Sequence, residues 1–186
     1  MTGKKELRAE LIRLRKAMPP ETRLDAEAEI FGRVVRCEQY KSYEALLIYV
    51  SDGIETDTRR LIRQALADGK QVFTPRCFKA EDRMTFHRIT SFDDLEEGRF
   101  GLLEPKAHCE QYLPVKNALC VTPALAYDLS GHRLGFGRGF YDRFLSDFEG
   151  FKLGICYDSF IIENVFRESF DIPVDMIITD KREYLC

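Results

Sequence analysis

The stretch 45-ALLIYVSDGIETDTRRLIRQALADGKQVFTP-75 decides the fold. It opens on an apolar run, 45–50, with the length and composition of a strand that is covered on both faces. Thr56 or Asp57 can cap the segment that follows, and Gly69 is well placed to end that segment before the strand-like run 71–75. Strand, helix and strand in this order are typical of neighbouring parallel strands joined by a crossover helix.

The same alternation extends along the chain. Helices are expected over 4–18, 20–37, 140–148 and 161–166. Further strands are expected over 84–89, 118–127, 151–157 and 174–179, with a short helical turn and a loop over 91–105. We therefore predict an α/β fold, a single domain over residues 1–186 with a mostly parallel central sheet and helices on both faces. In such sheets, ligands bind beyond the carboxyl ends of the strands.

For two of these segments the sequence also predicts which side is buried. In the first helix, apolar residues recur at helical spacing and predict one buried stripe, made of Leu7, Leu11, Leu14 and Met18. The run 84–89 alternates as a half-exposed strand does.

The composition is that of an ordinary folded protein, with 45% hydrophobic and 32% charged residues. The formal net charge of −3 argues against a general attraction to nucleic acid. Because no apolar run reaches the length of a membrane span and the first residues lack the core of a signal peptide, a soluble, cytoplasmic protein is expected. Six cysteines without a C-x-x-C pair favour reduced thiols over a zinc site or a disulfide scaffold.

A glycine-rich segment, 128-DLSGHRLGFGRGFYDR-143, follows the predicted strand 118–127. Gly135, Gly137 and Gly139 let a ligand approach the backbone, whose N–H groups lead into a helix and are suited to phosphate. Arg133 and Arg138 add positive charge. The segment thus indicates an anion site, with a mobile turn between strand and helix as the alternative.

A carboxylate just inside the following helix, Asp142, is suited to a divalent metal that bridges phosphate oxygens. The combination predicts a nucleoside triphosphate bound with magnesium. The segment satisfies neither G-x-x-x-x-G-K-[ST] nor G-x-G-x-x-G, so it is neither a P-loop nor a dinucleotide fingerprint.

The run 131-GHRLGFGRGFYDR-143 resembles the signature of the 5-formyltetrahydrofolate cyclo-ligase family, which is close to G-x-R-L-G-x-G-x-G-[FY]-Y-D-R. Other landmarks resemble those of the family in order along the chain: KKELR at 4–8, IET at 54–56, TPR at 74–76, MTF at 84–86, GLLEP at 101–105 and RESFDIPVDMIITD at 167–180. The likeness spans nearly the whole chain. It implies a NagB/RpiA/CoA transferase-like architecture.

The resemblance also implies an activity, that of an ATP- and Mg²⁺-dependent ligase. Members of the family convert 5-formyltetrahydrofolate, with or without a polyglutamate tail, into 5,10-methenyltetrahydrofolate while ATP becomes ADP and phosphate. The formyl oxygen takes the γ-phosphoryl group, N10 attacks the activated carbon, and phosphate leaves. Because no protein nucleophile is needed, catalysis would rest on positioning and charge stabilisation. A monomer without nucleic-acid or membrane partners is expected.

The resemblance assigns roles to residues of this chain. Arg133, Arg138 and Tyr141 would be catalytic, and Asp142 and Asp171 would hold magnesium directly or through water. The expected ATP-binding residues are Lys4, Arg8, Arg133, Leu134, Gly135, Phe136, Gly137, Arg138, Gly139, Phe140 and Tyr141. The i, i+4 spacing of Lys4 and Arg8 places them on one helix face, for which a solvated basic face is the alternative.

The expected folate-binding residues are Val50, Asp52, Gly53, Glu55, Met84 and Phe86. Where the family has a glutamate that contacts the pterin, this chain has Gly53, so either Asp52 or Glu55 would supply the carboxylate. Met84 and Phe86 would line the folate pocket or belong to the core.

Three departures lie in the glycine segment: Phe136 stands at a position that is often basic or aromatic, Arg138 at one that is often glycine or lysine, and Phe140 at one that is often tyrosine. We expect changed affinity from them rather than lost activity. Two other functions stay open. One is a relative that binds folate or nucleotide with little turnover. The other is a nucleic-acid-binding module built on the GRGF stretch and the basic N-terminal helix, against which the negative net charge argues.

Overall fold

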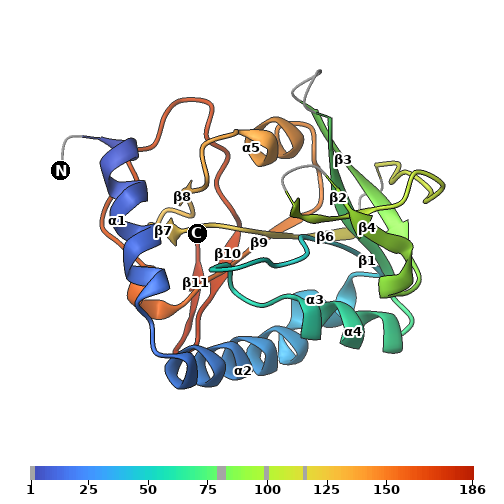
Figure 1. The fold of residues 1–186 in the computed structure, drawn as a ribbon, viewed down its shortest axis with the longest axis horizontal. Helices are drawn as coiled ribbons and strands as arrows, with labels where there is room; N and C mark the ends of the chain where they lie inside the picture. The colour runs from blue at the N-terminus through green and yellow to red at the C-terminus, as the bar shows by residue number, and fades with distance from the viewer. Residues whose placement is uncertain (1–2, 79–82, 99–100, 115–116) are drawn as a thin grey trace.

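A seven-stranded sheet with five parallel strands at its centre runs through the protein (Figure 1). The computed structural model describes residues 3–78, 83–98, 101–114 and 117–186. The strands, in sheet order, are β11 (Glu183–Leu185), β10 (Met176–Ile178), β9 (Phe151–Ile155), β6 (Ala118–Thr122), β1 (Ala45–Ile48), β2 (Gln71–Phe78) and β3 (Arg83–Ile89). From β10 to β2 neighbouring strands are parallel, and the two edge pairs are antiparallel. This confirms the predicted α/β fold with a mostly parallel sheet.

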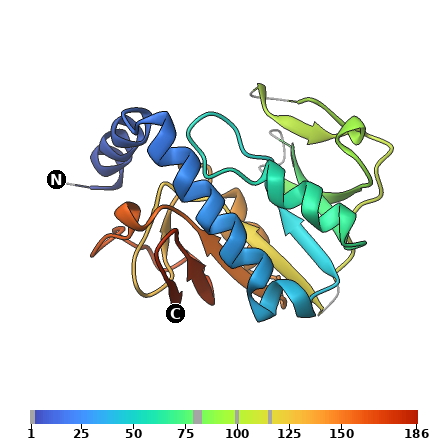
Figure 2. The same cartoon turned by 90° about the horizontal axis from the view of Figure 1, so that it is seen from below.

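Helices cover both faces of the sheet, as predicted. The helices are α1 (Lys4–Lys16), α2 (Pro20–Arg36), α3 (Glu38–Ser42), α4 (Arg59–Ala67) and α5 (Phe140–Leu145). Figure 2 shows α2 and α4 running across one face. Successive side chains of β1 pack on opposite faces of the sheet. Leu46 and Ile48 pack in the core with Val34 of α2, whereas Leu47 packs with Leu145 of α5. None of the helices in the described part of the chain is both long and apolar enough to span a membrane.

The order of the strands positions the site. The chain passes from β1 through α4 to β2 on one side, and later returns as β6 on the other side of β1. Such a reversal leaves a crevice beyond the carboxyl ends of the two strands, where ligands bind in open α/β sheets. The loops after β1 and β6 are therefore the expected floor of a site.

Several segments differ from the sequence predictions. The predicted helix over 161–166 is wrong: Ile161 bridges to Tyr127, and the Asn164 side chain accepts the Phe166 N–H at 2.6 Å in a turn where Phe166 has φ +57°. The predicted strand 118–127 is interrupted, because β7 (Ala126–Tyr127) turns back against β8 (Arg133–Leu134) before the glycine segment.

Further small elements lie at the sheet's edge. The loop over 91–105 contains a 3-10 turn, Phe92–Asp94, and the pair β4 (Leu95–Glu97) and β5 (Leu103–Pro105). Strand β3 is buried on both faces rather than half-exposed, because α5 packs on one side and the backbone of Glu110 and Tyr112 pairs along its edge.

Helix α1 is confirmed, and its buried stripe differs from the predicted one at a single position, Leu14, since Met18 is partly buried against the core. Leu7 and Leu11 are buried, whereas Leu14 is 41% exposed and the neighbouring Arg15 is 3% exposed. Its guanidinium donates to the carbonyl oxygens of Ile54 at 3.1 Å, Ala124 at 2.8 Å and Leu125 at 2.9 Å, and it lies over two aromatic rings. These carbonyls belong to the loops after β1 and β6, so Arg15 joins the two loops.

We predict that Arg15→Ala lowers the free energy of unfolding by about 3 kcal/mol or more, because it leaves buried carbonyl oxygens without a donor. Urea unfolding measures this loss. Arg13→Ala is the matched control: its side chain on the same helix is 66% exposed and pairs with Glu10, so a change within about 0.5 kcal/mol is expected. A loss below about 1 kcal/mol for Arg15→Ala would contradict this account of the loops.

Candidate functional site

A pocket of about 580 Å³ lies beyond the carboxyl ends of β1 and β6. Tyr49 and Val50 line it just after β1, and Pro123 lines it just after β6. Its volume is typical of sites for small ligands. The pocket therefore lies where the strand order predicts a site.

Most of the predicted site residues line this pocket. They are Lys4, Arg8, Val50, Glu55, Met84, the run 133–142 and Asp171. Asp52, Gly53 and Phe86 are not among its lining residues. Asp52 and Gly53 are exposed at the tip of a turn, and Phe86 is 1% exposed in the core beside α5.

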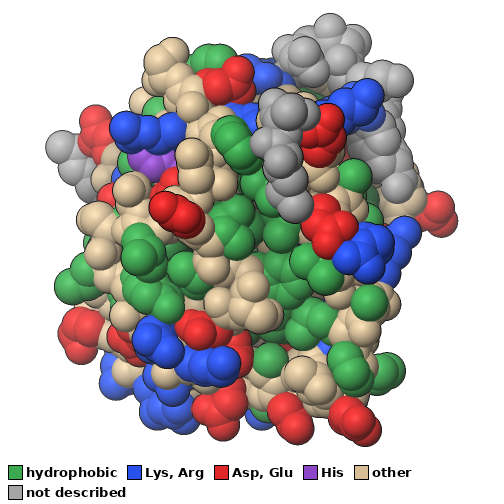
Figure 3. Space-filling model, turned by 90° about the vertical axis from the view of Figure 1, so that its left-hand side faces the viewer, with side chains coloured by type: hydrophobic (Ala, Val, Ile, Leu, Met, Phe, Trp, Pro, Cys, Tyr) green, Lys and Arg blue, Asp and Glu red, His purple; other side chains and the backbone are tan. Residues whose placement is uncertain are grey.

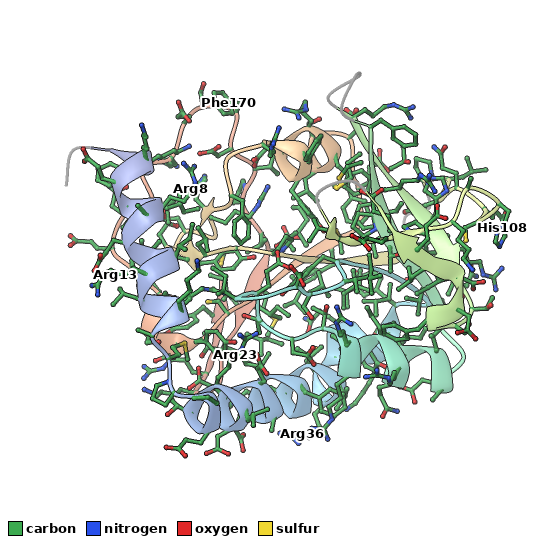
Figure 4. The ribbon with its side chains drawn as sticks, in the orientation of Figure 1. Arg8, Arg13, Arg23, Arg36, His108 and Phe170 are labelled. Carbon is green, nitrogen blue, oxygen red and sulfur yellow. The ribbon has the colours of Figure 1, made fainter. Side chains whose placement is uncertain are left out.

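The glycine segment makes a basic wall with α1. Arg8 Nε donates to the Gly135 carbonyl oxygen at 2.8 Å, and Figure 4 shows Arg8 directed inward from α1 while Arg13 points outward. Gly137 has φ +95°, and a Cβ there would lie 3.2 Å from Arg8 Cζ. A side chain at this position would thus be strained and crowded. Helix α5, with six residues, is short, so the arginines supply most of the positive charge.

This positive charge is local. Figure 3 shows basic and acidic side chains interspersed over the face that carries α1, in keeping with the net charge of −3. The basic residues of the pocket are Lys4, Arg8, Arg133, Arg138 and Arg143. Five carboxylates line the same pocket, and three of them pair with Lys4 or Arg133: Glu168, Asp171 and Asp142. The positive charge is therefore concentrated on the wall made by α1 and the glycine segment, where it favours a small polyanion over an extended one.

The two predicted metal-binding carboxylates both face the pocket and both already have partners. Asp142 Oδ1 accepts Arg133 Nη2 at 2.6 Å and the Ile172 N–H at 3.2 Å. Asp171 Oδ2 accepts Lys4 Nζ at 2.7 Å. Burial opposes ionisation of Asp171, but the hydrogen bonds from Lys4 and the Glu168 N–H, together with the charges of Lys4 and Arg133, outweigh it, and the pKa of Asp171 is lowered. Both carboxylates are therefore held in place by hydrogen bonds from basic side chains.

Their number suits magnesium, which keeps several waters and binds proteins through one or two carboxylates together with phosphate oxygens. Among the described residues, one group of three potential ligands lies within 4.8 Å, and it is elsewhere: Asp94, His108 and Cys109. Asp94 Oδ2 there accepts N–H and O–H groups of Thr90 and the N–H of Ser91, as expected of a turn-capping carboxylate.

The opposite wall is mainly apolar. Pro75, Cys77 and Met84 come from the β2–β3 hairpin, and Leu102 and Leu103 come from the segment at β5. Burial raises the pKa of the Cys77 thiol to about 11, so it is protonated at neutral pH. Such a wall suits a flat, largely uncharged ring system.

Two further polar groups line the pocket, Glu55 from the turn after β1 and Tyr141 from α5. Burial raises the pKa of Glu55 to about 7, against the opposing effects of the Asp52 N–H and the Arg15 charge. Tyr141 Oη is buried without a hydrogen-bond partner in the described part of the chain, and burial raises its pKa well above the usual value. A neutral phenol and a carboxylate that titrates near neutral pH are both suited to a polar ligand.

Some lining residues were not singled out from the sequence as site residues. They are Tyr49, Pro75, Cys77, Leu102, Leu103, Glu104, Pro123, Arg143, Glu168 and Phe170. Several of them lie inside the segments that resemble family landmarks, and this was the signal in the sequence that could have found them: Pro75, the segment 102–104, Glu168 and Phe170. Tyr49, Cys77 and Pro123 carry no local signal, because their exposure to the pocket depends on packing.

Comparison with known proteins gives a consistent result. A model of the 5-formyltetrahydrofolate cyclo-ligase family matches residues 1–180. The Escherichia coli (strain K12) protein named 5-formyltetrahydrofolate cyclo-ligase is 29% identical over 174 residues, covering 90% of this chain and 95% of that protein. A Caenorhabditis elegans protein named probable 5-formyltetrahydrofolate cyclo-ligase is 29% identical over 196 residues, covering 96% and 95%.

Solved structures agree. The NMR structure of Aquifex aeolicus 5,10-methenyltetrahydrofolate synthetase is similar at a TM-score of 0.84 and 29% identity, covering 98% of this chain and 92% of that one. A 5,10-methenyltetrahydrofolate synthetase from Mycoplasma pneumoniae, at a TM-score of 0.77 and 18% identity, shares the fold. With its signature segment lining the pocket and the family model matching nearly end to end, the chain belongs to the 5-formyltetrahydrofolate cyclo-ligase family.

Proposed function

We propose that this protein converts 5-formyltetrahydrofolate into 5,10-methenyltetrahydrofolate and uses MgATP as the second substrate. One observation carries the proposal: a single pocket joins a basic, glycine-lined wall to an apolar wall, and the part-buried carboxylate of Glu55 also lines it. The first wall suits a triphosphate and the second suits a pterin. The names of the relatives, cyclo-ligase and methenyltetrahydrofolate synthetase, support the same reaction.

The basic wall would bind ATP. Lys4, Arg8 and Arg138 would neutralise the phosphates, and the backbone of 135–139 would approach them closely because of its glycines. Asp142 and Asp171 would hold magnesium, which neutralises charge on the transferring phosphoryl group. Arg133 binds Asp142 and the Ile172 carbonyl oxygen, at 2.6 and 2.7 Å, so we assign it the positioning of Asp142.

The apolar wall would bind the folate. Met84 and Val50 would contact the pterin ring, and the ionised carboxylate of Glu55 would accept hydrogen bonds from its N–H groups. Asp52 and Gly53, which are exposed and do not line the pocket, would not. Because Glu55 lines the pocket and Asp52 and Gly53 do not, this placement supports Glu55 as the carboxylate that contacts the pterin.

The chemistry would need no protein nucleophile. The formyl oxygen would attack the γ-phosphorus of ATP and displace ADP. N10 would then attack the activated carbon and lose its proton, and the C–O bond to phosphate would break with release of phosphate. The chain's own contribution is to align the two substrates, to exclude water, and to stabilise the charge in transit with Arg138 and the Tyr141 hydroxyl.

We predict that the protein with 5-formyltetrahydrofolate and MgATP yields the near-ultraviolet absorbance of the methenyl product. Asp142→Asn should lose most of this activity, because it weakens both the Arg133 pair and the expected metal contact. Tight binding of the folate without product would instead identify a relative with little turnover. No product and no folate binding would overturn the proposal.

Lys4→Ala should raise the KM for ATP by roughly 10- to 100-fold, the effect of losing one charged hydrogen bond, with little change in the KM for the folate. Steady-state kinetics with each substrate varied in turn measures the split. Lys5→Ala is the matched control, since Lys5 is the exposed neighbour on α1 and lies outside the pocket lining. If the KM for ATP rose equally in the two variants, Lys4 would belong to a solvated basic face and would not bind ATP.

Glu55→Gln should stabilise the protein in alkaline solution and weaken folate binding. Burial raises the pKa of Glu55 from 4.5 to about 7. The native protein therefore loses stability as pH rises through this window, and above it the loss stays constant. The variant should therefore gain roughly 1–3 kcal/mol relative to the native protein between about pH 5 and about pH 8.5, measured by urea unfolding. An equal gain at both pH values would contradict the assignment.

A further inference from the structure

Two arginines hold the turn that carries Glu55 by three successive carbonyl oxygens. Arg23 Nη1 donates to the Gly53 oxygen at 2.7 Å, and Arg23 Nη2 donates to the Glu55 oxygen at 2.7 Å. Arg15 Nη1 donates to the Ile54 oxygen between them at 3.1 Å. A surface loop seldom has every carbonyl at its tip bound by charged donors from two different helices, so the turn is rigidly held.

Arg23 is itself fixed in direction. Its Nε donates to Glu27 Oε1 at 2.8 Å, one turn along α2, and the same oxygen accepts Tyr157 Oη at 2.7 Å. Tyr157 is buried just after β9. Figure 4 shows Arg23 on the inner side of α2 and Arg36 at its outer side. The chain of contacts therefore runs from the sheet, through α2, to the rim of the pocket.

The turn has little freedom left. The Glu55 N–H donates to the Asp52 carbonyl oxygen at 3.0 Å, and Glu55 Oε2 accepts the Asp52 N–H at 2.9 Å. Gly53 has φ +52°, a conformation that a glycine adopts without strain. With the backbone of Gly53 and Glu55 held by Arg23, the carboxylate of Glu55 has a defined position at the pocket.

We propose that Arg23 is a positioning residue for folate recognition: it fixes the turn 53–55 so that the Glu55 carboxylate meets the pterin. The inference rests on the proposed function, because Glu55 is taken as the group that reads the folate. Arg23 does not line the pocket, so it acts through Glu55 and not by contact with a substrate. A purely structural role, holding α2 on the sheet, is the competing explanation.

The planar guanidinium makes the distinction testable. The Arg23 guanidinium donates hydrogen bonds to Glu27 and to two carbonyl oxygens at once. A lysine ammonium keeps the charge but cannot reach all three acceptors in the same geometry. Arg23→Lys should therefore preserve most of the stability and still disturb the turn. A group that only fastens α2 would instead be rescued by lysine.

The experiment compares Arg23→Ala, Arg23→Lys and the control Arg36→Ala, which removes an exposed arginine from the far end of the same helix. Arg23→Ala should raise the KM for 5-formyltetrahydrofolate by roughly 10-fold or more, with the KM for ATP within about twofold. Arg23→Lys should show most of the same rise, and Arg36→Ala none. Equal rises in both KM values, or full rescue by lysine, would overturn the proposal.

A double-mutant cycle adds a readout that a structural role would not give. If Arg23 acts through Glu55, then Arg23→Ala made in the Glu55→Gln background should change the KM for the folate by less than about twofold. Independent, multiplying effects would contradict the inference. Urea unfolding of each variant shows whether loss of folding contributes to the kinetic change.

The outcomes also separate this inference from the proposed function. If the native protein neither forms the methenyl product nor binds the folate, the proposed function fails before any variant is made. If the native protein is active and Glu55→Gln raises the KM for the folate, but Arg23→Ala does not, the positioning role alone fails.

Discussion

The buried guanidinium of Arg15 is the contact on which the site depends. It joins α1 to the carbonyl oxygens after β1 and after β6, the two strands that border the reversal of strand order. A charge at 3% exposure is tolerated because carbonyl dipoles and two aromatic rings replace its water. Arg15 thereby fixes the distance between the loop after β1 and the loop after β6. A pocket between these loops requires that they stay apart.

The rest of the pocket is assembled from segments far apart in the chain. Lys4 at the start of α1 binds Asp171 and Glu168, and Arg8, one turn on, binds the backbone of the glycine segment. Arg133 then ties Asp142 to the backbone of Ile172. Helix α1 thus contributes both to the basic wall and, through Arg15, to the turn that carries Glu55.

The departures from the family pattern have a structural explanation in part. Phe140 is 9% exposed and packs in one core cluster with Phe86, so an apolar ring there contributes to packing. Phe136 is 45% exposed at the pocket, where its ring is available to a ligand. Gly53 occupies the tip of a turn with positive φ, and the carboxylate two residues later takes the position facing the pocket.

Local patterns in the sequence were sufficient for the α/β fold, the parallel centre of the sheet and the glycine segment as the core of the site, because strand and helix periodicity and glycine spacing are local properties. They failed where neighbours are distant in sequence. The segment 161–166 is irregular and begins with Ile161 paired to Tyr127, and β11 forms because it pairs with the edge of β10.

The same distinction between local sequence patterns and contacts of distant segments applies within the site. The resemblance to the family indicated Lys4, Arg8 and the run 133–142, and residue type and spacing pointed independently to the glycines, Arg133, Arg138 and Asp142 of that run. Tertiary packing alone shows that Glu55 lines the pocket while Asp52 and Gly53 do not, that Phe86 lies in the core, and that Arg15 is buried instead of Leu14. A side chain's direction in a turn, and whether a cation can be buried, depend on acceptors and walls that other segments supply, and these exist only once the chain has folded.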